Sequence, residues 1–127
     1  MHQTRVLLVD DSQEFLQALK AFFVQSSELS IVGWAESGVS AVQKVQKLHP
    51  DLVFMDISMP GMNGLEATRE IKRLSNPPHV IMLTVFDDPE YRRASTAAGA
   101  DGFISKTELA IEAPIALERL FGMKGIL

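Results

Sequence analysis

The sequence predicts a single α/β domain in which helices cover both faces of a parallel five-stranded β-sheet. Two observations support this prediction. Short apolar runs alternate five times with longer segments whose apolar residues recur every three or four positions. Such alternation requires right-handed crossover connections, which place the strands parallel and the helices over the sheet. The length of 127 residues and the 46 % of hydrophobic residues also suit one domain with its own core.

The first two strand and helix pairs lie before residue 50. Residues 6–9 are the first predicted strand, and Ser12 is the expected N-cap of the helix that follows. Residues 30–35 form a weaker second strand, after which Ser37 caps the second helix. The predicted buried faces of the two helices are Phe15, Leu16, Leu19, Phe22 and Phe23, and then Val39, Val42, Val45 and Leu48.

The third pair contains the most apolar strand. Residues 52–56 follow Pro50 and precede a loop rich in proline and glycine, which is typical of a strand buried on both faces. Asn63 and Glu66 then have the spacing of a capping box at the start of a helix. The predicted buried face of this helix is Leu65, Thr68, Ile71 and Leu74.

The last two pairs are less apolar. Residues 80–84 form the fourth predicted strand, and Asp88 with Pro89 should begin the fourth helix. That helix should be the most loosely held, with Tyr91, Ala94, Ala97 and Ala98 as its inward candidates. Residues 103–105 form the fifth strand. Pro114 is expected to open the last helix, Gly122 to end it, and its buried face is expected to be Ile115, Leu117, Leu120 and Phe121.

Composition excludes several classes of site. The chain has no cysteine, so it has neither a disulfide framework nor a thiolate metal site. No signal peptide or membrane-spanning run is present, which predicts a cytoplasmic protein without membrane contact. The net charge of −4 argues against direct nucleic acid contact by this chain.

Polar residues follow four of the five predicted strands. Asp10 and Asp11 follow the first, Asp56 ends the third, Thr84 ends the fourth and Lys106 follows the fifth. The carboxyl ends of parallel strands meet at one edge of a sheet, so these side chains should share one cleft. Three carboxylates repel one another unless a cation lies among them, and oxygen ligands suit Mg²⁺. An ammonium and a hydroxyl opposite them could contact a phosphoryl group, with Asp56 as its acceptor.

Four motifs in this order resemble the receiver domain of two-component response regulators. They are Val9-Asp10-Asp11-Ser12, residues 55–64 with the sequence Met-Asp-Ile-Ser-Met-Pro-Gly-Met-Asn-Gly, residues 83–88 with Leu-Thr-Val-Phe-Asp-Asp, and Ile104-Ser105-Lys106. The resemblance covers essentially the whole chain. It implies a flavodoxin-like (βα)5 three-layer sandwich with strand order 2-1-3-4-5, so that residues 1–127 form one receiver domain with no effector domain in this chain.

The resemblance also implies a role for each site residue. Asp56 would accept a phosphoryl group from a sensor histidine kinase or a phosphotransfer protein. Mg²⁺ would be held by Asp10, Asp11, Asp56 and the backbone carbonyl of Ser58. Lys106 and Thr84 would contact the phosphoryl group, and Phe103 would change position together with Thr84. Access to the site and the lifetime of the phosphate would depend on Ser58, Val85 and Phe86.

One departure from the common family pattern and one motif indicate a subgroup. Thr107 follows Lys106 where many members have proline, and residues 84–88 resemble the NarL/FixJ/LuxR-type regulators. This implies a signalling switch, not an enzyme, which assists its own phosphorylation and dephosphorylation. It would regulate transcription through an attached helix-turn-helix domain absent from this chain, and it could form a homodimer through the last helices and strand.

Other interpretations remain open from sequence alone. The chain could be a stand-alone single-domain regulator, or a receiver-like module that is not phosphorylated, although Asp10 and Asp11 are both intact. A Mg²⁺-dependent phosphohydrolase is less favoured, because Ser58 stands where such enzymes carry an acid/base aspartate. Taken singly, Asp10 could be a helix cap and Phe103 a core residue.

Overall fold

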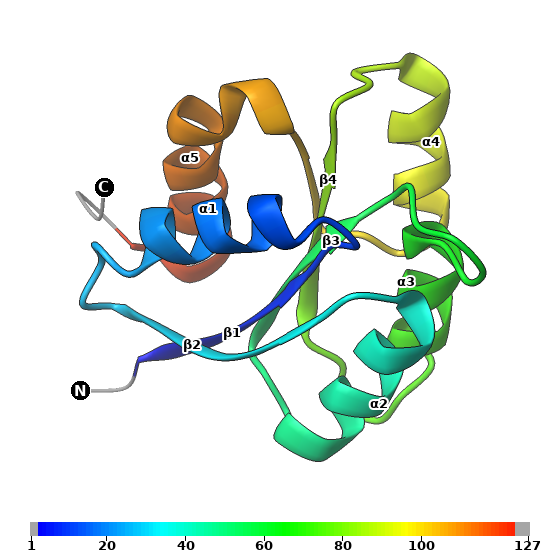
Figure 1. Cartoon of the computed structure of the whole chain (residues 1–127), viewed down its shortest axis with the longest axis horizontal. Helices are drawn as coiled ribbons and strands as arrows, with labels where there is room; N and C mark the ends of the chain where they lie inside the picture. Colours follow the sequence, from blue (N-terminus) through cyan, green and yellow to red (C-terminus); the bar gives the residue numbers. More distant parts are fainter. Residues whose placement is uncertain (1–2, 124–127) are drawn as a thin grey trace.

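A five-stranded parallel sheet forms the middle layer of the computed structural model, which describes residues 3–123 (Figure 1). The strand order is β2-β1-β3-β4-β5, as predicted. The strands are β1 (Thr4–Val9), β2 (Leu29–Ala35), β3 (Leu52–Asp56), β4 (His79–Thr84) and β5 (Gly102–Ser105). The helices are α1 (Gln13–Phe23), α2 (Gly38–Leu48), α3 (Gly64–Lys72), α4 (Pro89–Ala97) and α5 (Leu109–Phe121), with a 3₁₀ turn (Lys106–Glu108) before α5.

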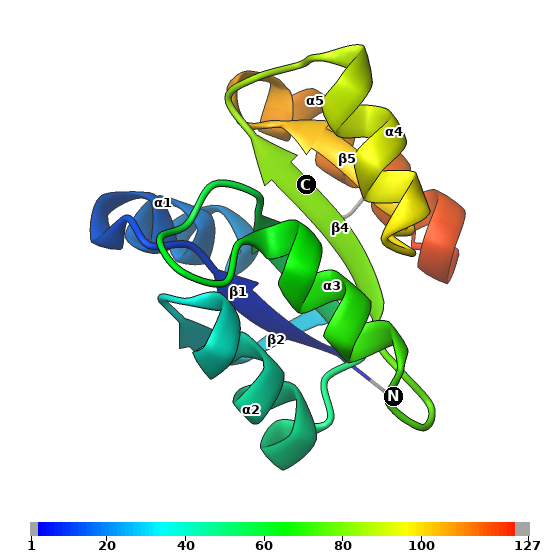
Figure 2. The same ribbon diagram turned by 90° about the vertical axis from the view of Figure 1, so that its right-hand side faces the viewer.

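Helices cover both faces of the sheet and create two hydrophobic cores. On one face α1 and α5 pack over Leu8 and Phe54, and the Phe23 ring stacks on Phe54 with the ring centroids 4.6 Å apart. On the other face α2 and α3 pack over Val53 and Met55, and Figure 2 shows these helices and α4 in front of the sheet. Successive strand residues point to opposite faces, so every residue of β3 is buried. This confirms the prediction of a strand buried on both faces.

The predicted helix caps are present. The side chains of Ser12 and Ser37 accept hydrogen bonds from backbone N–H groups three residues further along. Asn63 and Glu66 form the complete capping box, and Asp88 accepts from an N–H in the first turn of α4. These caps satisfy donors that have no partner inside the helix, which is why the helices begin at these positions.

The prediction for the start of α5 was wrong. The helix begins at Leu109, and Pro114 lies inside it. Proline lacks an N–H and removes one internal hydrogen bond, which normally disfavours this position. Here Ala113, Ala116 and Leu117 are buried against the sheet on both sides of the proline, and this packing outweighs the lost bond.

The predictions of the buried faces of three helices share one error, because each includes a residue that is exposed in the structure. Val39 on α2 and Ile115 on α5 are 52 % and 63 % exposed, and Ala97 on α4 is also exposed. Small residues are buried instead, namely Gly38 and Ala41 on α2, Ala113 and Ala116 on α5, and Ser95 on α4. Close packing of a helix on a sheet favours small side chains, whereas a hydrophobicity pattern gives more weight to bulky ones. Ser95 is the only buried residue within α4, which confirms that this helix has a poorly buried face.

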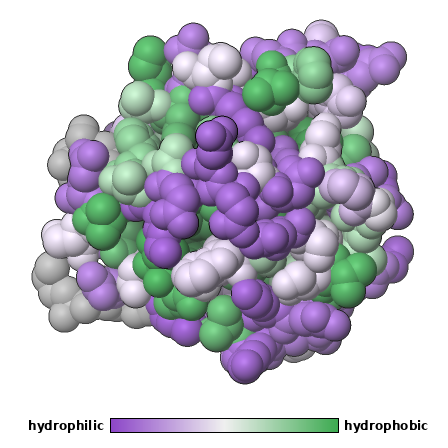
Figure 3. Space-filling model, in the orientation of Figure 1, coloured by the Kyte–Doolittle hydropathy of each residue, from purple (hydrophilic) through white to green (hydrophobic). Residues whose placement is uncertain are grey.

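Hydrophilic side chains cover much of the surface shown in Figure 3, where hydrophobic residues form separate patches. The large hydrophobic residues exposed in the part of the chain that the structure describes are Val24, Trp34, Val39, Val85, Phe86, Ile111 and Ile115. Between residues 3 and 123 no helix is long and apolar enough to cross a membrane.

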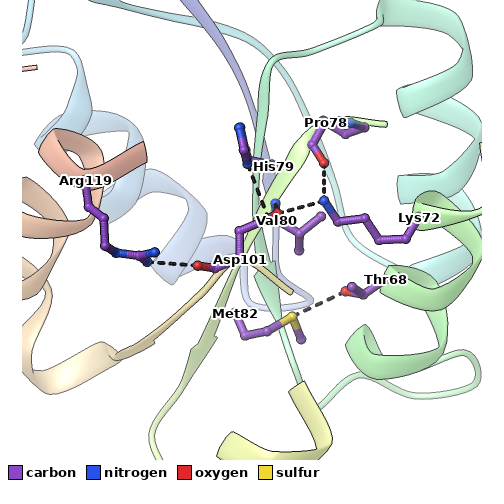
Figure 4. Close-up of polar contacts among 8 residues, drawn as sticks. All are labelled: Thr68, Lys72, Pro78, His79, Val80, Met82, Asp101 and Arg119. Atoms are coloured by element: carbon purple, nitrogen blue, oxygen red, sulfur yellow. Dashed lines mark hydrogen bonds and ion pairs between the residues drawn. The ribbon is translucent and has the colours of Figure 1, made fainter. Parts of the chain in front are cut away.

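A polar cluster around Asp101 joins several elements at the amino-terminal edge of β4 and β5 (Figure 4). The Asp101 carboxylate accepts hydrogen bonds from Lys72 Nζ at 2.7 Å and from the Val80 backbone N–H at 2.8 Å, and His79 Nδ1 lies 3.4 Å away. Arg119 donates to the Asp101 carbonyl at 2.8 Å. The residue therefore connects α3, β4, the turn before β5, and α5.

Asp101→Asn is expected to lower the free energy of unfolding by about 1–2 kcal/mol at neutral pH. Burial alone would raise the pKa of Asp101, but the hydrogen bonds from Lys72 and Val80 outweigh it and hold the pKa below its usual value. The stabilisation should therefore be present above about pH 4 and disappear as the pH falls through the folded-state pKa. Urea unfolding at several pH values measures this. Glu70→Gln breaks the exposed pair with Arg73 and should change stability by less than about 0.5 kcal/mol; an equal effect of both variants would contradict the prediction.

Candidate functional site

The carboxyl edge of the sheet brings the predicted acidic residues together. Asp10 directly follows β1, and Asp56 is the last residue of the neighbouring strand β3. Carboxylate oxygens of Asp10, Asp11 and Asp56 all lie within 4.8 Å of one another. Asp10 and Asp56 are buried, with 0 % and 4 % exposure, whereas Asp11 is exposed. The site therefore opens to solvent on the side of Asp11.

The electrostatics of this cluster disfavour the ionised form of Asp56. Burial is the largest cause, and the charge of Asp10 adds to it. The charge and hydrogen bond of Lys106 act in the opposite direction, and the charge of Asp11 again disfavours ionisation. Together they raise the pKa of Asp56 to about 6. The carboxylate is consequently ionised at neutral pH but less stable than an exposed one, which favours its binding to a cation or to an electrophile.

Lys106 supplies the positive charge inside the cluster. Its Nζ lies 2.6 Å from Asp10 Oδ2 and 3.2 Å from Asp56 Oδ1, and its side chain is only 13 % exposed. The same ammonium lies 4.3 Å from the centroid of the Phe15 ring. Phe15 was predicted only as a core residue of α1, and no sequence signal indicated that its ring also contacts the lysine.

Thr84 lies at the end of β4, next to β3, and its side chain is buried. Its Oγ1 accepts a hydrogen bond from the backbone N–H of Phe86 at 3.0 Å. Thr84 therefore follows Leu83, the residue of β4 that pairs with Asp56, and its hydroxyl is bonded to the following loop. In that loop Val85 and Phe86 are both exposed, and the Phe86 ring stacks on Tyr91 of α4 with centroids 6.4 Å apart.

The backbone of Asp56 is held by the beginning of α3. A Cβ atom at Gly64 would lie 2.0 Å from the Asp56 carbonyl oxygen, so only glycine fits there. The Gly64 N–H also donates to the Ile57 carbonyl at 2.9 Å. From the sequence, Gly64 was expected only as part of the loop rich in proline and glycine. Its position shows that the acidic site requires close contact between the loop after β3 and α3.

The remaining predicted residues lie outside the acidic cluster. Ser58 is exposed two positions after Asp56. Phe103 is half-buried on β5, at the margin of the core beneath α2 and α3, and the guanidinium of Arg92 lies 4.5 Å from its ring centroid. The structure thus brings Asp10, Asp11, Asp56 and Lys106 into one site, with Thr84 at its margin and Phe103 on the adjoining edge strand.

Comparison with known proteins agrees with this geometry. The model of the response regulator receiver domain matches residues 6–114. The chemotaxis protein CheY of Halobacterium salinarum is 45 % identical over 102 residues, which cover 80 % of this chain and 83 % of that protein. The transcriptional regulatory protein LiaR of Bacillus subtilis is 37 % identical over 108 residues, covering 85 % of this chain but 51 % of LiaR.

Solved structures of receiver domains also have the fold of this chain. The signal receiver domain of the response regulator NarL from Mycobacterium tuberculosis has a TM-score of 0.84 at 25 % identity, with 94 % of this chain and 98 % of that one covered. This chain spans about half the length of the transcriptional regulatory proteins DegU and LiaR that it matches.

Proposed function

This chain belongs to the family of response regulator receiver domains of two-component systems, and we propose that phosphorylation of Asp56 switches its output surface. Receiver domains are signalling switches that interact with histidine kinases or phosphotransfer proteins. The relatives include transcriptional regulators and NarL-type receivers, which confirms the predicted subgroup. The observation that carries the proposal is the buried Asp56 carboxylate, which lies 3.2 Å from Lys106 beside two further carboxylates.

The side chains around Asp56 suit phosphoryl transfer. An Asp56 carboxylate oxygen would attack the phosphorus of a phosphohistidine, the P–N bond would break, and an acyl phosphate would form as the histidine regains its nitrogen lone pair. The Lys106 ammonium is close enough to neutralise charge on the transferred group. The Thr84 hydroxyl accepts its hydrogen bond from Phe86, so its own proton is free to be donated to a phosphoryl oxygen.

The acidic cluster also suits Mg²⁺, which receiver domains generally bind at an acidic pocket. Asp10, Asp11 and Asp56 would hold the ion, with the backbone carbonyl of Ser58 as a further ligand. Three clustered carboxylates with one nearby ammonium leave net negative charge, and oxygen ligands are those that Mg²⁺ prefers. When bound, the ion would neutralise charge on the phosphoryl group.

We further propose that the exposed residues Ser58, Val85 and Phe86 govern access to the acyl phosphate and its lifetime.

The output is proposed from the relatives. Similarity to LiaR supports transcriptional regulation through a helix-turn-helix domain, with residues 1–127 as the receiver unit. Homodimerisation through α4, β5 and α5 belongs to this proposal. Similarity to CheY, of which the chain covers 83 %, supports a second candidate, a regulator that acts through its receiver domain alone.

Incubation with Mg²⁺ and a small phosphodonor tests the phosphorylation. We expect intact-mass analysis to show one phosphoryl group, labile to base and to hydroxylamine, on the wild-type chain and none on Asp56→Ala. Glu118→Gln, which removes an exposed carboxylate on α5, should be phosphorylated as the wild type is. A covalent phosphate that survives Asp56→Ala would refute the assignment of the acceptor. Turnover of more than one phosphate ester per chain would favour a phosphohydrolase.

A further inference from the structure

Arg92 connects the loop after β4 to β5. Its Nε lies 2.7 Å from Asp87 Oδ1, and its guanidinium carbon lies 4.5 Å from the centroid of the Phe103 ring. The hydrogen bond that the Arg92 guanidinium donates to the Asp87 carboxylate raises the pKa of Arg92, and the charge of Glu112 on α5 adds to this effect. The Arg92 guanidinium on α4 thus interacts with Asp87 in the loop, with Phe103 on β5 and with the charge of Glu112 on α5.

The same loop is also attached to α4 by the residue before Arg92. The Phe86 ring stacks on Tyr91, and the Phe86 backbone N–H holds the Thr84 hydroxyl at 3.0 Å. Ser95 is the only residue within α4 that is buried, so contacts of its half-exposed side chains contribute much of what fixes this helix. A displacement of Thr84 would therefore be transmitted to Asp87 and to the position of Arg92.

We propose that Arg92 is a positioning residue that restrains Phe103, and that the contacts Asp87–Arg92–Phe103 form a latch favouring the unphosphorylated arrangement. The proposal deepens the function proposed above and rests on phosphorylation at Asp56. Arg92 reaches the reacting atoms only through other residues. When the Thr84 hydroxyl turns to a phosphoryl group, the loop moves, and the guanidinium loses the geometry that joins Asp87 to Phe103.

The effect on phosphoryl binding follows from linkage. A contact that is present only in the unphosphorylated arrangement must be broken when a phosphoryl group binds. The free energy of that contact is therefore subtracted from the binding free energy, and the affinity falls accordingly. The side chains of Arg92 and Asp87 are 47 % and 53 % exposed, so solvent and salt screen their ion pair strongly. A cation–π contact at such a surface remains modest. Removing the latch should therefore raise the affinity by about two- to fivefold.

The test is titration of the full chain with beryllofluoride, a phosphoryl mimic, in the presence of Mg²⁺. We expect Arg92→Ala and Asp87→Asn to bind about two- to fivefold more tightly than the wild type. Arg92→Lys keeps a cation and should lie closer to the wild type. Arg93→Ala, which removes the exposed neighbouring arginine of α4, should bind as the wild type does. The difference between Arg92→Ala and the wild type should shrink at about 1 M salt.

A readout on Phe103 separates the latch from a general effect on folding. With selectively labelled phenylalanine, the Phe103 ring resonances of free Arg92→Ala should shift toward those of the beryllofluoride-bound wild type. Equal or weaker affinity of Arg92→Ala compared with Arg93→Ala, or an unshifted Phe103 signal, would overturn the latch alone. A wild-type chain that binds no beryllofluoride and accepts no phosphate would instead overturn the phosphorylation of Asp56.

Discussion

Asp56→Asn is expected to raise the free energy of unfolding by about 2–3 kcal/mol at about pH 8 in a buffer without divalent ions. The reason is that the folded state raises the pKa of Asp56 from 3.8 to about 6. A carboxyl group whose pKa is raised by folding contributes its full stability below the unfolded-state value and loses it as the pH rises through about 6. The wild-type protein therefore holds an unfavourable charge above pH 6, which asparagine lacks.

Urea unfolding followed by fluorescence measures this effect, because Trp34 is the only tryptophan in the chain. The advantage of Asp56→Asn over the wild type should be largest near pH 8 and vanish below about pH 4. Glu118→Gln serves as the control, since this exposed carboxylate should give no such difference. A constant difference between the wild type and Asp56→Asn across this pH range would show that ionisation of Asp56 is not its cause.

Lys106→Met is expected to lower the free energy of unfolding by about 3 kcal/mol under the same conditions. The substitution keeps the apolar stem beside Phe15 and removes the ammonium that lies between Asp10 and Asp56. The two buried carboxylates would then remain without their nearest positive charge. Added Mg²⁺ should restore part of the stability, because it would bind the folded state preferentially.

A double-mutant cycle identifies the source of this loss. In the Asp56→Asn background, Lys106→Met should cost less than in the wild type, since one of the two carboxylates has been neutralised. Lys47→Met, an exposed lysine of α2, is the control and should change stability by less than about 0.5 kcal/mol. Additive losses in the cycle would mean that Lys106 does not stabilise the fold through its interaction with Asp56.

The acidic site could be predicted from sequence because its geometry follows from strand ends. Asp10, Asp56 and Lys106 follow short apolar runs, and a parallel sheet necessarily brings such positions to one edge. The caps at Ser12, Ser37, Asn63 and Asp88 were also predictable, since caps depend on local hydrogen bonds. The strand order was predicted from the resemblance to receiver domains. The bounds of β3 are as predicted, and the other four strands begin one or two residues earlier than predicted.

Features that depend on side-chain packing were not predictable. The exposure of Val39 and Ile115 follows from how closely each helix approaches the sheet, which hydrophobic periodicity does not encode. The same holds for Pro114, whose helix is retained by tertiary packing. Contacts between Arg92 and Phe103, or between Lys106 and Phe15, join residues from different elements at distances that only the folded chain fixes.

The cluster around Asp101 fixes the carboxyl-terminal end of α4 to the rest of the fold. The carboxyl-terminal end of α4 leads within four residues to Asp101, which is bound to α3, β4 and α5. The other end of α4 begins at the loop that carries Thr84 and Asp87. If phosphorylation of Asp56 displaces that loop, as proposed above, α4 would be expected to move most at its amino-terminal end, because its other end is tied through Asp101. Under the proposed switch, a small movement of the Thr84 hydroxyl would therefore be expected to rotate the exposed surface of α4 about its carboxyl-terminal end.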